Sequence, residues 1–167
     1  NMVAPLLFSK PGGDFIYGYY HGALNLSKGN SYVNGAGEFI THWPWGYSLY
    51  VSLFVTESFD ETVYRLGLAN CVVAVLWFFL LYHLFSVTLS KIPPIIPFFI
   101  AILWPTMVGM YFPQIVELLF SLFITGSMVL LYHIVNSKSD TGLFWKLILL
   151  GSTLGAAILI KTMAIPY

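Results

Sequence analysis

Three ionisable residues stand where the sequence could support chemistry at a membrane: Asp14, Glu117 and Lys161. A carboxylate can accept a proton from a hydroxyl group or bind a metal ion. A cation can bind a phosphate. We therefore take Asp14 and Glu117 as candidate catalytic residues and candidate metal ligands. Lys161 is a candidate substrate-binding residue, and each of the three also has a purely structural alternative.

Glu117 lies near the start of an apolar segment, where a carboxylate is costly unless it faces a wet cavity, a cation or a partner. Polar residues recur around it at the helical spacing of three or four: Gln114, Glu117, Ser121 and Thr125. This spacing predicts one polar stripe that faces the interior of a helix bundle. The alternative is a carboxylate that only reaches to the interfacial water.

Asp14 follows Pro11, Gly12 and Gly13, which allow a sharp turn ahead of a surface helix. Its alternative is an ordinary helix N-cap, because aspartate is a preferred capping residue. Lys161 ends the last apolar segment. It could bind a phosphate or simply extend its ammonium group to water.

Aromatic residues form a second group. The segment from His42 to Tyr47 reads HWPWGY and leads from a polar loop into an apolar run. Its rings could stack on a sugar, so His42 and Tyr47 are candidate substrate-binding residues. The alternative is that the rings anchor the chain among lipid headgroups. His83 and His133 each follow a tyrosine near the end of an apolar segment and are expected at the interface.

The composition indicates that these residues belong to a protein embedded in lipid. Hydrophobic residues make up 58% of the 167-residue chain and charged residues only 8%, whereas soluble domains are about 25% charged. The solvent is therefore expected to be lipid, and membrane lipid is an expected partner. The net charge is zero and no Lys/Arg cluster occurs, which argues against nucleic acid as a partner. Cys71 has no second cysteine to pair with.

The hydropathy pattern predicts an all-α, polytopic membrane bundle with juxtamembrane helices. Residues 65–167 are expected to form the bundle, with four spans at Leu66–Phe85, Pro94–Met110, Phe112–Ile134 and Leu143–Ile160. Residues 1–64 are expected to form a juxtamembrane region. A surface helix is predicted over Asp14–Ser27, and Pro44–Val55 is too short for a comfortable span. The short connections predict antiparallel packing of consecutive helices.

The distribution of charge predicts the orientation. Lys91, Lys138 and Lys146 fall in loops on one side of the expected bundle. Most of the acids fall on the other side, together with Lys10, Lys28 and Arg65. Lysine and arginine in short loops mark the cytoplasmic side. Residues 1–64 are therefore expected to face the periplasm, the lumen or the exterior. Gly151 and Gly155 form a GxxxG pattern in the last span, which permits close packing within the chain or with a second chain.

Taken in order, these features resemble the GT-C superfamily of membrane glycosyltransferases, which includes the protein O-mannosyltransferases and the lipid A aminoarabinose transferases. The similar segments cover nearly the whole chain: GDFIYGYYHGALNLSKG at 13–29, HWPWGYSL at 42–49, VYRLGLAN at 63–70, PQIVE at 113–117 and LGSTLGAAILIK at 150–161. Two positions depart from the family pattern. Phe15 follows Asp14 where the family often has a pair of acids, and Lys161 stands where an arginine is usual.

The resemblance implies transfer of a sugar from a polyprenyl-phosphate donor to an acceptor hydroxyl on the non-cytoplasmic face, with a divalent metal ion as a possible cofactor. It also implies a further span upstream of this segment and many downstream. Two alternatives from other classes stay open. The chain could be a non-catalytic membrane scaffold subunit beside other membrane subunits, or a transporter whose path follows the stripe around Glu117.

Overall fold

The computed structural model describes residues 15–89, 91–103, 116–137 and 142–161. Regular structure in these ranges is helical, apart from one isolated antiparallel bridge between Val33 and Phe39. Three of the described helices are long and apolar enough to cross a membrane: α3 (Phe59–Thr88), α6 (Val116–Val135) and α7 (Leu143–Ile160). This finding agrees with the all-α membrane protein that the hydropathy pattern predicts.

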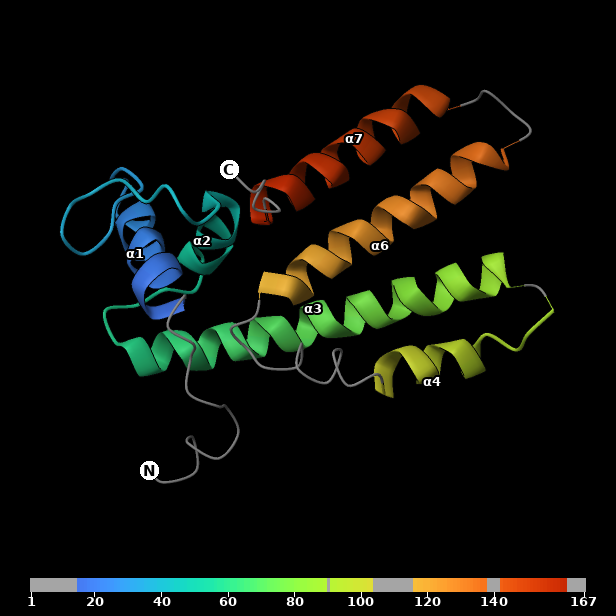
Figure 1. Ribbon diagram of the computed structural model, residues 1–167, viewed down its shortest axis with the longest axis horizontal. Helices are drawn as coiled ribbons and strands as arrows, with labels where there is room; N and C mark the ends of the chain where they lie inside the picture. Colours follow the sequence, from blue (N-terminus) through green and yellow to red (C-terminus); the bar gives the residue numbers. More distant parts are fainter. Residues whose placement is uncertain (1–14, 90, 104–115, 138–141, 162–167) are drawn as a thin grey trace.

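The three long helices lie side by side (Figure 1). Helix α7 has the predicted bounds and runs antiparallel to α6. Helix α6 runs in the same direction as α3, because α4 (Ile95–Leu103) returns the chain between them. The predicted span Pro94–Met110 is described only as far as Leu103, and its remainder lies outside the described residues. The span Pro94–Met110, the second in chain order, therefore stays a prediction.

Among the side-chain hydrogen bonds that join the long helices, two involve hydroxyl groups of α6. The indole Nε1 of Trp77 on α3 donates to Oγ1 of Thr125 on α6 at 3.0 Å, and both residues are buried. Ser127 Oγ on α6 donates to Thr153 Oγ1 on α7 at 2.9 Å. Each such bond between membrane helices contributes about 0.6–2 kcal/mol. Thr125 thus lies inside the bundle, as its place in the polar stripe predicts.

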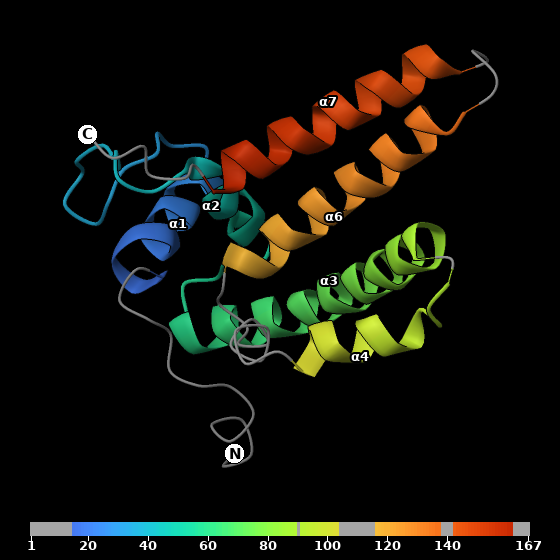
Figure 2. The same cartoon turned by 45° about the vertical axis from the view of Figure 1, so that its right-hand side comes forward.

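The segment of residues 15–58, part of the predicted juxtamembrane region, packs against one end of the long helices (Figures 1 and 2). It contains the π-helical turn η2 (Phe15–Tyr20), which continues into α1 (His21–Ser27), and the short helix α2 (Trp45–Ser52). The first two occupy most of the predicted helix Asp14–Ser27. At ~1.5 Å per residue, the 8 residues of α2 extend only ~12 Å, which is too short to cross a bilayer.

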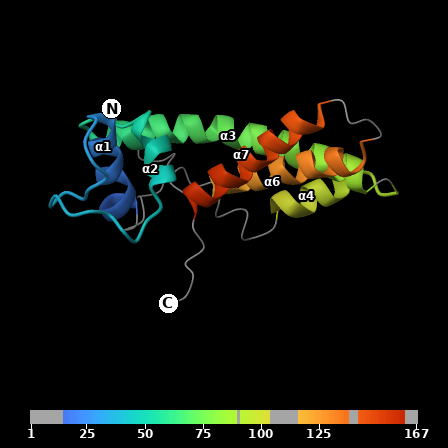
Figure 3. The ribbon, with the colours of Figure 1, turned by 90° about the horizontal axis from the view of Figure 1, so that it is seen from above.

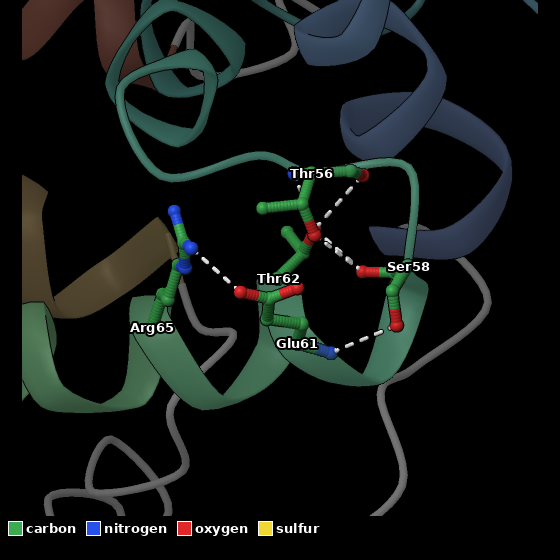
Figure 4. Close-up of polar contacts among 5 residues, drawn as sticks. All are labelled: Thr56, Ser58, Glu61, Thr62 and Arg65. Carbon is green, nitrogen blue, oxygen red and sulfur yellow. Dashed lines mark hydrogen bonds and ion pairs between the residues drawn. The ribbon is translucent and has the colours of Figure 1, made fainter.

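Helix α3 begins earlier than the apolar pattern predicts, at Phe59 rather than Leu66. Ser58 caps its first turn by accepting a hydrogen bond from the backbone N–H of Glu61, and Glu61 pairs with Arg65 at 2.6 Å (Figure 4). Thr62 is fully buried and exchanges hydrogen bonds with Thr56. These polar contacts add helical turns that hydropathy does not reveal, so the predicted boundary at residue 64 falls within α3.

The two ends of the molecule along its long axis carry different elements (Figure 3). One end holds η2, α1, α2 and the start of α3, with Glu57, Asp60 and Glu61. The other end holds the end of α3 and the start of α7, with Lys91 and Lys146. These acids and these lysines lie at opposite ends. Lys28, Arg65 and Lys161 lie at the end with the acids and pair with Glu57, Glu61 and Glu117, so the orientation stays a prediction.

Candidate functional site

The first element of the candidate site is an ion pair between α6 and α7. Lys161 Nζ lies 2.8 Å from Glu117 Oε1, and the two side chains are 38% and 39% exposed. The same ammonium group lies 5.8 Å from the centroid of the Phe120 ring. Glu117 is in the first turn of α6 and Lys161 is the C-cap of α7. Each charge therefore complements the dipole of its own helix.

The structure shows what the side chains of Glu117 and Lys161 contact, and both the functional and the structural interpretations of the two residues stay open. A carboxylate at this depth needs water, a cation or a partner, and Glu117 has both a cation and partial exposure. Lys161 is neither fully extended into water nor enclosed. Because each side chain is more than one third exposed, an anion from the surrounding phase could compete with Glu117 for the ammonium group.

Helix α2 packs directly on the end of α7 beside this pair. A Cβ atom at Gly46 would collide with the backbone carbonyl of Leu159. Only glycine lets the two backbones approach so closely. The contact holds the segment from His42 to Tyr47 next to the turn of α7 that carries Lys161.

Tyr47 follows Gly46 in α2 and is fully buried. Its ring packs edge-to-face on Tyr19, with the centroids 5.0 Å apart. Its hydroxyl is enclosed without a hydrogen-bond partner among the described residues. Burial is the main cause that raises the pKa of the Tyr47 phenol, and the Tyr50 phenol acts in the same direction. The ring is therefore not open to a ligand in this structure.

Tyr50 connects the same short helix to α3. Its hydroxyl donates to Asn70 Oδ1 at 2.8 Å, and Asn70 is buried. Burial raises the pKa of Tyr50 to about 12. Helix α2 therefore contacts both the N-terminal half of α3, through Asn70, and the C-terminal end of α7, through Gly46.

The second element is a surface hollow of about 730 Å³ between α1 and the loop that precedes α2. Aromatic, imidazole and carboxylate side chains line it together with loop backbone, among them Tyr17, His21, Glu38, His42 and Trp43. Rings with polar edges can stack on a sugar while the polar groups bind its hydroxyls. His42 is thus exposed on the wall of a hollow, unlike Tyr47.

Local hydrogen bonds shape the loop around this hollow. Oδ1 of Asn34 accepts from the backbone N–H groups of Ala36 and Glu38, at 2.9 and 3.0 Å. The Tyr32 hydroxyl lies 3.3 Å from the carbonyl oxygen of Trp43 and donates to it. Together with the isolated bridge between Val33 and Phe39, these bonds fix the conformation of the loop beside the hollow.

Two glycines allow the aromatic side chains of the loop to lie against the η2–α1 segment. A Cβ atom at Gly18 would overlap the Trp43 ring, and one at Gly22 would overlap the Tyr32 ring. The position of Trp43 in the wall of the hollow therefore depends on the absence of a side chain at Gly18. The clustering of aromatic residues in the sequence was the only signal for Tyr17, His21 and Trp43, and it did not identify the hollow.

Of the residues predicted from sequence, the structure brings Glu117 and Lys161 into contact and places His42 on the hollow. Asp14 lies outside the described residues, so its role and its approach to Glu117 stay predictions. Within the described ranges, no three histidine, cysteine, aspartate or glutamate side chains form a group that could hold a metal ion.

Comparisons with protein-family models, with curated proteins and with solved structures find no match to this chain.

Proposed function

We propose that this chain is part of a polytopic membrane glycosyltransferase of GT-C type, which transfers a sugar from a polyprenyl-phosphate donor to an acceptor hydroxyl. The observation that carries the proposal is the Glu117–Lys161 pair, at 2.8 Å and partly exposed, where the long helices meet the juxtamembrane region. An ammonium group at that level could bind the phosphate of a donor whose lipid tail lies in the bilayer.

The hollow supports the same proposal from the acceptor side. It offers rings for stacking and polar groups for hydroxyls, and its wall includes His42 and Trp43. The chain continues from Trp43 to Gly46, which contacts α7 two residues before Lys161. A sugar-bearing head group held by Lys161 would therefore be close to the segment that borders the hollow.

The reaction assigned to the site is a substitution at the anomeric carbon. The acceptor oxygen forms a bond to that carbon while the bond from the carbon to the phosphate oxygen breaks. A carboxylate takes the hydroxyl proton, and Asp14 is the predicted base with Glu117 as the second acid. The polyprenyl phosphate leaves with its negative charge, which Lys161 stabilises.

The proposal includes an orientation. The end that carries η2, α1 and α2 would face the periplasm, lumen or exterior, and the end with Lys91 and Lys146 would face the cytoplasm. The exposed apolar side chains of α3 and α7 would then contact lipid. A donor carried to the outer face of the membrane would meet both elements of the site.

A transfer assay in liposomes tests the proposal, with full-length protein and radiolabelled polyprenyl-phosphate sugars. Lys161→Met should lower kcat/KM for the donor by about 10–100-fold, because loss of a charged hydrogen-bond partner costs about 1.5–3 kcal/mol. Lys28→Met is the matched control. Lys28 is also paired with a glutamate, Glu57 at 3.6 Å, but its side chain is 51% exposed, and its loss should leave transfer unchanged.

The scaffold alternative is favoured by one observation on α7. A Cβ atom added at Gly151 or Gly155 would meet no described atom within 4 Å, so this side of α7 is open to another helix. If wild-type protein transfers nothing from any polyprenyl-linked donor, the transferase proposal fails. Co-purification of a second membrane chain, lost in Gly155→Leu, would then support the scaffold.

A further inference from the structure

Two histidines meet at the end of the bundle opposite the candidate site. Nε2 of His83 on α3 lies 3.1 Å from Nε2 of His133 on α6, and the rings stack with centroids 5.4 Å apart. Both side chains are exposed. A neutral imidazole has one N–H donor and one bare nitrogen, and the tautomers decide which of the two rings donates in this contact.

The separation of the two nitrogens also suits a shared metal ion. Zinc–nitrogen bonds are ~2.0–2.1 Å long, so two imidazoles bound to one ion at ~90–110° hold their nitrogens ~2.9–3.4 Å apart. The observed 3.1 Å lies inside this range. Binding one ion requires both exposed rings to turn until their lone pairs converge on it.

We propose that His83 and His133 form a binding site for a divalent late transition-metal ion, such as Zn²⁺, that clamps the ends of α3 and α6 together. Imidazole nitrogen suits zinc, copper and nickel, whereas magnesium and calcium prefer oxygen ligands. Within the described residues no third histidine, cysteine or carboxylate joins the pair. The proposed site takes its two protein ligands from these histidines, with water in the positions that no described residue fills.

The arrangement of the helices makes this site a property of the folded chain. His83 and His133 are 50 positions apart in the sequence. They meet because α3 and α6 run parallel and end at the same level (Figure 1). An ion that binds only the folded form shifts the folding equilibrium toward that form, by ~100-fold when its free concentration is ~100 times Kd.

The test is metal titration of the full chain in detergent, prepared with an affinity tag that contains no histidine. Zn²⁺ should raise the Tm of the wild type and saturate at one ion per chain, and Mg²⁺ should not. His83→Gln and His133→Gln should each weaken Zn²⁺ binding by at least about 10–100-fold, the loss seen when even the outer partners of metal ligands are removed. His42→Gln, at the opposite end, should bind Zn²⁺ like the wild type.

A second variant separates ligand loss from misfolding. His133→Cys offers a thiolate in place of the imidazole and should retain Zn²⁺ binding that His133→Gln loses. Bound Cu²⁺ should show electron paramagnetic resonance couplings to two imidazole nitrogens, and to only one in His83→Gln. The proposal is overturned if the wild type shows no saturable Zn²⁺ shift. It is equally overturned if both glutamine variants bind Zn²⁺ like the wild type.

Discussion

The ion pair between Glu117 and Lys161 predicts a measurable coupling between α6 and α7. The perturbation is a double-mutant cycle of Glu117→Gln, Lys161→Met and the two together. Glutamine keeps the shape of the glutamate, and methionine keeps most of the length and apolar contact of the lysine. The cycle therefore isolates the interaction between the two charges from the packing of their side chains.

The geometry bounds the size of this coupling. Opposite unit charges 2.8 Å apart attract by ~1.5 kcal/mol in bulk water and ~6 kcal/mol at an effective dielectric constant of ~20. Desolvation and the ordering of the side chains offset much of this attraction. Exposed pairs yield ~0.2–1 kcal/mol, and breaking a buried pair costs ~3–5 kcal/mol. Side chains that are 38% and 39% exposed lie between these limits, so we expect about 1–2 kcal/mol.

The assay is reversible unfolding of the chain in detergent, at low and high salt. The coupling should decrease as salt rises, because the pair is partly exposed. The control cycle uses Lys28 and Glu57, which are 3.6 Å apart with side chains 51% and 90% exposed, and should yield less than about 0.5 kcal/mol. If the Glu117–Lys161 coupling is no larger than that of the control, the register assigned to α6 and α7 is wrong.

Three further predictions concern packing, burial and orientation. Gly46→Ala should destabilise the fold by about 1–3 kcal/mol in the same unfolding assay, because its Cβ would strike the backbone of α7. Gly151→Ala has open space and should be neutral or stabilising by up to about 1 kcal/mol; equal losses would contradict the contact. Tyr47→Phe removes an unpartnered buried hydroxyl and should not reduce stability. Burial raises the pKa of this phenol, so the wild type should lose stability as pH rises above ~10 and Tyr47→Phe should lose less; a destabilised variant would show a missed partner. In a background without Cys71, Ser31→Cys should be labelled from outside intact cells and Asn136→Cys protected, and the reverse pattern would invert the orientation.

Much of the helical structure could be predicted from hydropathy alone. Helix α7 has the predicted bounds, Leu143–Ile160, because a run of apolar residues in lipid must satisfy its backbone hydrogen bonds within a helix. The start of α3 could not be predicted in this way. Its first turn is polar and depends on Ser58 and Glu61, whose capping contact is local and carries no hydropathy signal. The π-helical turn Phe15–Tyr20 likewise has no pattern that distinguishes it from an α-helix.

Residue type and position in or beside an apolar segment were enough to single out Glu117 and Lys161, since ionisable groups there are costly. For His83 and His133 the sequence predicted only a position at the interface. Which groups meet was decided only by the tertiary structure. Glu117 contacts Lys161 because α6 and α7 are antiparallel neighbours, and His83 contacts His133 because α3 and α6 are parallel. Sequence periodicity specifies which face of a helix is polar but not which helix lies against it. Which helices become neighbours depends on packing between segments far apart in the chain, such as the contact of Gly46 with the backbone at the end of α7.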